Sequence, residues 1–315
     1  MKRSDAPLAD HVTDKTGSAG LPKVSLLVTD LDNTLWDWVY MWHRSFSPLL
    51  DGMLRISGIP REQLIPAIRE VHQLRRTAEY SFLIGELQML RDKHGTTADL
   101  QEIYREAIEA ARDARINALR LYPGVLETLS EIKEQGTTIA AYTESLAFWT
   151  SYRIKKLDLD GILDYVYSPP DHDFPAGISA EDLRTRESDR YELKATIHRP
   201  TPIGVTKPSP AILNQIISDL GDSGGVAGVV YVGDSLMKDI AMAQEVGARD
   251  AWAKYGVAQQ RDEYELLREV THWTDADVER ERQIARRPNV TPSVTLDDRF
   301  AELLNYFEFV KNGRR

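Results

Sequence analysis

The chain has 315 residues, which is enough for one large hydrophobic core with a smaller attached domain. Its 42% hydrophobic and 28% charged residues are typical of a soluble globular protein, and no apolar run approaches the roughly 20 residues that span a bilayer. The net charge of −10 repels nucleic acid and anionic membranes, and the absence of cysteine excludes disulfides, thiolate nucleophiles and cysteine-ligated zinc.

Residues 1–22 are polar and lack the apolar stretch of a secretory signal, so we expect a disordered tail there. The absence of cysteine fits a reducing compartment. We therefore expect a cytoplasmic protein with neither a nucleic-acid nor a membrane partner. The sequence leaves the oligomeric state open.

Short apolar runs indicate the strands of a parallel sheet. The first run, Val24–Val28, is continuous rather than alternating, as in strands that are buried on both faces. Similar runs end at Thr143 and Asp234, and a helical pattern follows each of them. Strands that alternate with helices predict an α/β fold with a parallel sheet.

Residues 37–120 have a different pattern. Apolar residues recur at spacings of three and four in "REQLIPAIREVHQLRR" and "TTADLQEIYREAIEAARDARINAL", and Thr96 with Asp99 matches a helix capping box. No buried strand is evident in this stretch. We therefore expect an all-helical domain inserted after the first strand, with the α/β core resuming near residue 121.

Three tryptophans, Trp36, Trp38 and Trp42, stand where this insert begins. One interpretation is that they pack between the insert and the core. The other is that they form a wall facing a substrate. The sequence alone does not separate the two.

The second half of the chain contains the remaining helices and an unusually long connection. Residues 168–206 carry five prolines and many charges, and a connection of this length is expected to be functional or disordered. Ser209 is expected to cap a helix that Gly221 ends, and Asp239 to cap a further helix. Residues 257–289 are typical of charged surface helices, and a last strand and helix follow.

Acidic residues stand at the ends of the predicted strands. Asp30 and Asp32 follow the first strand, and Asp234 follows the third. A buried carboxylate is costly without a partner, and three that meet at the carboxyl edge of one sheet repel one another and need a cation. We expect Mg²⁺, because it prefers oxygen ligands and is bound through carboxylates together with a substrate phosphate.

A family resemblance is carried by four elements in chain order: Asp30-x-Asp32-x-Thr34, Thr143, Lys207-Pro208, and Gly233-Asp234 with Asp239. In this order and at strand ends, the four elements resemble the haloacid dehalogenase superfamily of hydrolases, which are mostly phosphatases. The resemblance covers roughly residues 23–36 and 121–256. It implies a doubly wound, Rossmann-like parallel sheet with an inserted helical cap.

The resemblance also assigns roles to these residues. Asp30 would be the nucleophile that forms an aspartyl-phosphate, and Asp32 the general acid and base. Lys207 would neutralise the phosphoryl oxygens and keep Asp30 ionised. The metal ligands would be Asp30, the main-chain carbonyl of Asp32, and Asp234, with Asp239 holding a water of the metal or orienting its neighbours.

Further groups would bind the phosphate. Thr143 would donate a hydrogen bond to a phosphoryl oxygen, and the backbone N–H groups of Leu31 and Asn33 are additional candidate donors. Glu144 follows Thr143 where many relatives have asparagine, and we include it in the expected substrate-binding set. Lys207 belongs to this set as well.

We therefore expect a Mg²⁺-dependent phosphatase of a small phosphorylated metabolite. Its core would comprise residues 23–36 and 121–315, with a lid-like insertion at 168–206, and residues 37–120 would form the cap. Asp32 argues against a dehalogenase, since halide needs no proton when it leaves. A dehalogenase, a phosphomutase and a non-catalytic protein that binds a phosphorylated metabolite stay open as alternatives.

Overall fold

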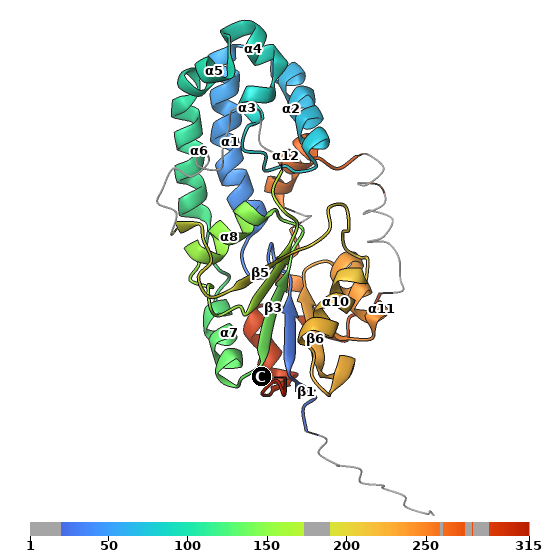
Figure 1. Cartoon of the computed structure of the whole chain (residues 1–315). Coiled ribbons are helices and arrows are strands. Elements are labelled where there is room, and N and C mark those ends of the chain that lie inside the picture. Colours follow the sequence, from blue (N-terminus) through green and yellow to red (C-terminus); the bar gives the residue numbers. More distant parts are fainter. Residues whose placement is uncertain (1–19, 173–189, 259–260, 275–278, 280–289, 315) are drawn as a thin grey trace, which may run out of the picture.

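The computed structural model describes residues 20–172, 190–258, 261–274, 279 and 290–314 (Figure 1). The disordered tail expected at 1–22 therefore lies almost wholly outside the described residues, as does the middle of the 168–206 insertion. Among the helices that are described, none combines the length and apolar character that a membrane span requires.

A parallel sheet forms the centre of the described chain, with its strands in the order β5–β4–β3–β2–β6–β7–β8. The strands are β2 (Leu26–Thr29), β3 (Thr138–Tyr142), β4 (Tyr165–Ser168), β5 (Ile197–Pro200), β6 (Val229–Gly233), β7 (Arg249–Ala253) and β8 (Val294–Leu296). Two short strands, β1 (Lys23–Val24) and β9 (Glu308–Phe309), pair separately. Because strands are added first on one side of β2 and then on the other, the expected doubly wound fold is confirmed.

Helices cover both faces of this sheet (Figure 1). One layer contains α7 (Val125–Glu134), α8 (Ala147–Lys156) and η5 (Phe300–Asn305), which share a core with Leu27. The other contains α10 (Ala211–Leu220) and α11 (Ala241–Val246), which share a core with Leu26 and Val28. Side chains alternate along a strand, so the continuous apolar run of β2 supplies both cores.

Six helices lie between β2 and α7, beyond the carboxyl ends of the strands (Figure 1). They are α1 (Trp38–Ser57), α2 (Arg61–Arg75), α3 (Leu83–Glu86), α4 (Gln88–His94), α5 (Thr97–Ile103) and α6 (Arg105–Ala118). All fall within the region where an all-helical insert is expected, and the capping box of Thr96 and Asp99 is present. The exact domain boundaries stay a prediction.

Both ends of the insert meet at its base. Trp36 pairs with Leu121 in an antiparallel bridge, and the N–H of Tyr122 donates to the carbonyl of Leu35 at 2.9 Å. At the start of α1, the side chain of Asp37 accepts the N–H of Tyr40. The insert is therefore joined to the core by two adjacent, hydrogen-bonded segments.

A helix from the last third of the chain packs against the insert, contrary to expectation. The charged pattern of 257–289 predicts surface helices, but α12 (Asp262–Val270) buries Tyr264 and Leu267 in the same apolar core as α1 and α2. The carbonyl of Val270 also lies 2.6 Å from Nδ1 of His72 in α2. Part of 257–289, including most of 275–289, lies outside the described residues.

The predicted helix caps are confirmed only in part. The helix predicted to start after Ser209 is α10, which begins at Ala211. Oγ of Ser209 accepts the N–H of Ala211 at 3.5 Å, and Gly221 is the C-cap, as predicted. Asp239 lies inside the short helix η3 (Leu236–Ile240). There the hydroxyl of Ser235 makes the capping bond, because Asp239 is buried against a lysine.

Candidate active site

The expected site residues come together at the carboxyl edge of β2, β3 and β6. They line a cavity of about 280 Å³. Of the sequence-predicted residues, the cavity is lined by Asp30, Asp32, Asn33, Thr143, Glu144, Lys207, Asp234 and Asp239. The side chain of Leu31 is instead buried in the apolar core.

Lys207 is the central cation of this site. Its buried Nζ donates to Oδ1 of Asp30 at 2.5 Å and to Oδ1 of Asp239 at 2.8 Å. Asp239 also accepts the hydroxyl of Tyr231 at 3.0 Å and the N–H of Ser235 at 3.1 Å. Lys207 therefore compensates two carboxylates at once.

Negative charge nevertheless exceeds positive charge around Asp30. Burial raises the pKa of Asp30 to about 7, although Lys207 acts in the opposite direction. Burial, together with repulsion from Asp239 and Asp30, raises the pKa of Asp234 well above its ordinary value. For Lys207, burial is outweighed by Asp239 and Asp30, so the pKa of its ammonium is raised.

These carboxylates have the spacing of a metal site. One oxygen from each of Asp30, Asp234 and Asp239 lies within 4.8 Å of the others. Three hard oxygen donors with incomplete charge compensation suit Mg²⁺, which binds to carboxylates and keeps room for waters and phosphate. The residues present therefore fit the metal that the sequence analysis expects.

Asp32 has partners quite different from those of Asp30. Its carboxylate accepts the indole N–H of Trp36 at 2.7 Å and the hydroxyl of Ser145 at 2.6 Å. A guanidinium N–H of Arg153 lies 3.4 Å away. Burial raises the pKa of Asp32, and Arg153 opposes this shift. The side chain is thus held in place by neutral donors and one arginine.

Arg153 also connects the core to the helical insert. It lies in α8 with 1% of its surface exposed and pairs with the carboxylate of Glu79, in the loop between α2 and α3. Glu79 in turn accepts the indole N–H of Trp38 at 3.0 Å. The chain Glu79–Arg153–Asp32 therefore links the insert to an aspartate at the site.

Thr143 and Glu144 are held by hydrogen bonds from Ser145, Lys207 and Lys238. Oγ of Thr143 accepts the N–H of Ser145 at 3.1 Å. Glu144 accepts the N–H of Lys207 and Nζ of Lys238, each at 2.8 Å. Burial would raise the pKa of Glu144, but Lys238 and Lys207 lower it.

Asn33 occupies a left-handed conformation with φ of 59°. Its N–H donates to the carbonyl of Trp36 at 2.8 Å, and its side-chain oxygen accepts the N–H of Val39 at 3.2 Å. The N–H that was expected to bind phosphate is therefore engaged inside the loop in this structure.

Several residues that line the cavity were not predicted from the sequence. They come from the insert, from the loop between β3 and α8, from η3 and from the segment around α12, and include Arg76, Thr77, Ser145, Lys238, Tyr264, His272 and Trp273. None belongs to a motif or a periodic pattern that points to chemistry. Among the tryptophans at the start of the insert, Trp38 lines the cavity and packs against the apolar cores of both the sheet and the insert. Trp42 is buried within the core of the insert and donates to the carbonyl of Ala78. A substrate-facing role for Trp38 stays a prediction.

Comparison with known proteins gives a consistent result. Residues 24–247 match the family model described as haloacid dehalogenase-like hydrolase. The glyceraldehyde 3-phosphate phosphatase of Pyrococcus furiosus is 22% identical over 240 residues, which cover 74% of this chain and 82% of that protein.

One of the matching solved structures shows the same fold. A 2-haloacid dehalogenase from Pseudomonas syringae matches with a TM-score of 0.52 and 19% identity, over 90% of this chain and 97% of that one. A phosphatase from Thermococcus onnurineus matches with a TM-score of 0.47 and 17% identity, over 92% and 99%.

Proposed function

The chain belongs to the haloacid dehalogenase-like hydrolases, and from this premise we propose that it is a Mg²⁺-dependent phosphatase of a small phosphorylated metabolite. The observation that carries the proposal is the different surroundings of Asp30 and Asp32, which are two residues apart. Asp30 accepts a hydrogen bond from Lys207, whereas Asp32 accepts hydrogen bonds from neutral donors and lies near Arg153. Carboxylates in such different surroundings are suited to different chemical roles.

In the proposed reaction, Asp30 attacks phosphorus and forms an aspartyl-phosphate. Lys207 lies within hydrogen-bonding distance of Asp30, where its charge favours the ionised nucleophile and attracts the phosphoryl oxygens. Bound Mg²⁺, held by Asp30, Asp234 and the carbonyl of Asp32, would supply further positive charge to those oxygens.

Asp32 is the proposed general acid and base. Its pKa is raised by burial, which favours the protonated form that a leaving alcohol needs. After the alcohol has left, the same carboxylate takes a proton from the water that hydrolyses the aspartyl-phosphate. Ser145 and Trp36 hold the side chain in position during both steps.

The proposal predicts that Asp30→Asn abolishes hydrolysis of 4-nitrophenyl phosphate in the presence of Mg²⁺. An amide cannot form the acyl phosphate, so we expect a loss of at least about a thousandfold, or about 4 kcal/mol in the barrier. EDTA should have a comparable effect, reversed by Mg²⁺. Asp51→Asn, on an exposed position of α1, is the matched control and should keep full activity. Full activity of Asp30→Asn would refute the covalent mechanism.

The role of Asp32 is tested with two substrates. Asp32→Asn should lose more activity on an alkyl phosphate than on 4-nitrophenyl phosphate, whose leaving group needs little protonation. An equal loss on both would argue against Asp32 as the acid. Phosphoryl exchange between sugar phosphates would instead indicate a phosphomutase, and release of halide from a haloacid a dehalogenase.

A further inference from the structure

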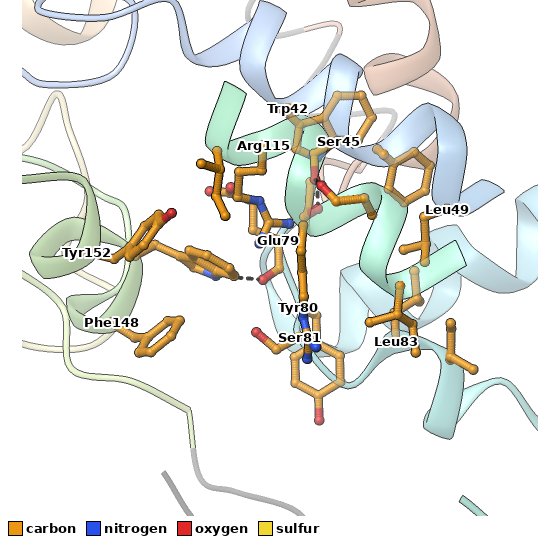
Figure 2. Close-up of a pocket in the computed structure, with 18 of the residues that line it drawn as sticks. Trp42, Ser45, Leu49, Glu79, Tyr80, Ser81, Leu83, Arg115, Phe148 and Tyr152 are labelled. Atoms are coloured by element: carbon orange, nitrogen blue, oxygen red, sulfur yellow. Dashed lines mark hydrogen bonds between the residues drawn. The ribbon is translucent and has the colours of Figure 1, made fainter. Parts of the chain in front are cut away.

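A second cavity, of about 160 Å³, lies between the helical insert and α8 (Figure 2). Among the described residues, it shares only Ala78, Glu79 and Trp149 with the cavity that contains Asp30. The indole N–H of Trp149 donates to the main-chain carbonyl of Glu79 at 3.0 Å, which joins two sides of this shared wall. The second cavity is therefore a separate space, divided from the first by the wall that these three residues form.

Its walls are mainly aromatic and aliphatic. Figure 2 shows Phe148 and Tyr152 on one side, and Leu49 and Leu83 on the other. Several polar groups of the lining are already bonded within the protein. Bonded in this way are the indole N–H of Trp42 and the hydroxyls of Ser45 and Tyr80. The walls thus offer mostly ring faces and alkyl groups to an occupant.

Charged groups also line the cavity, and Arg115 of α6 is the one that stacks on its aromatic wall. Its guanidinium lies over the ring of Trp149, 4.1 Å from the centroid. Its Nε is buried and, within the described part of the chain, has no hydrogen-bond partner. The nearby carboxylate of Glu79 is already engaged by Arg153 and Trp38. Arg112 lines the same cavity, so two arginines face it beside the single carboxylate of Glu79, and an anion in the cavity would compensate this excess positive charge.

We propose that this cavity binds a small carboxylate with an aromatic or branched apolar body, whose carboxylate pairs with Arg115. An apolar cavity of about 150 Å³ is large enough to hold benzene, so a single ring fits. Guanidinium and carboxylate form strong, charge-assisted hydrogen bonds. The occupant is a second molecule and not part of the phosphorylated substrate, because the bond between Trp149 and Glu79 separates the two cavities.

Binding of phenylacetate to the full-length protein, measured by titration calorimetry, tests the proposal. We expect one molecule per chain, bound at least about tenfold more tightly than the neutral isostere phenylacetamide. Arg115→Met should weaken phenylacetate binding by at least about tenfold. Arg105→Met, on an exposed position of the same helix outside the cavity, is the matched control and should leave it unchanged.

A second variant tests the site independently, in case Arg115→Met does not fold. Leu49→Trp narrows the cavity without changing its charge and should also abolish binding, while far-ultraviolet circular dichroism stays that of the wild type. Saturating inorganic phosphate should leave the affinity for phenylacetate unchanged. None of these measurements depends on catalysis, so their outcome is independent of the proposed phosphatase activity.

Several results would overturn the proposal. One is the absence of binding by phenylacetate, indole-3-acetate and isovalerate at millimolar concentration. Others are equal affinity for the acid and the amide, or unchanged affinity in folded Arg115→Met. Displacement of phenylacetate by phosphate would place the probe in the cavity of Asp30 and would equally refute a separate site.

Discussion

At the scale of single residues, the site is organised by which cation compensates which carboxylate. Asp30 and Asp239 share the ammonium of Lys207, whereas Asp32 is held by Ser145 and approached by Arg153. Asp30 and Asp32 are only two residues apart, yet they face different surroundings. This difference in surroundings is a physical reason for assigning a nucleophilic role to Asp30 and a proton-transfer role to Asp32.

Arg76 has a strained backbone at the wall of the same cavity. It ends α2 with φ of 54° and ψ of 33°, the left-handed region that costs roughly 1–2 kcal/mol for a residue with a Cβ atom. We predict that Arg76→Gly raises the free energy of unfolding by about 1 kcal/mol, measured by urea denaturation.

For the matched control, the expected change in the free energy of unfolding has the opposite sign. Glu70→Gly, at an exposed right-handed position inside α2, should lower the free energy of unfolding by about 1 kcal/mol. A loss of stability in both variants would show that the side chain of Arg76 contributes more than its backbone conformation costs.

At the scale of elements, the junction between α2 and α12 contains a buried histidine. Nδ1 of His72 faces the carbonyl of Val270, which can only accept, so this nitrogen carries the proton of the neutral ring. Burial lowers the pKa of His72 to about 4. The junction is therefore sensitive to acid.

The pH dependence follows from this shift. Between its ordinary pKa of about 6.5 and about 4, His72 is protonated in the unfolded chain but neutral in the folded one, so stability is lost as the pH falls through this window. His72→Gln removes this contribution. Between pH 7.5 and pH 5, the wild type should lose about 2 kcal/mol more than the variant in urea denaturation.

His43→Gln, in α1, serves as the control for this comparison and should follow the wild type. If His72→Gln loses as much stability on acidification as the wild type does, another group is responsible for the acid sensitivity of the junction.

At the scale of the whole molecule, the helical insert and α12, which comes from the last third of the chain, form one packed unit. The apolar core of the insert includes Tyr264, Leu267 and Val270 of α12, and residues from the same segment line the cavity of Asp30. We propose that the cap comprises α12 in addition to residues 37–120, so that any movement over the site involves both.

Two neighbouring leucines test this arrangement. Leu267 is 1% exposed and packs in the core of the insert, whereas Leu266 is only half-buried. Leu267→Ala should lower the free energy of unfolding by about 2–5 kcal/mol, and Leu266→Ala by clearly less. An equal loss of unfolding free energy in the two variants would mean that α12 is a surface helix, as its charge pattern predicts.

Much of the fold was predictable because its signals are local. The apolar run of β2 and the capping box of Thr96 and Asp99 each depend on a few adjacent residues. The prediction that Asp239 caps a helix failed because a polar side chain that can cap a helix can also be bound by a residue far away in the chain. Lys207 binds Asp239 in this way.

The sequence by itself determined that Asp30, Asp32 and Asp234 gather at one edge. Strand ends in a parallel sheet meet there regardless of the details of packing. Only the tertiary structure decided which groups surround them. Glu79 reaches Arg153 and Asp32, and Arg115 faces an apolar cavity, because helices far apart in the chain pack together. Contacts at such separation leave no periodic trace in the sequence, since they depend on the relative placement of whole elements.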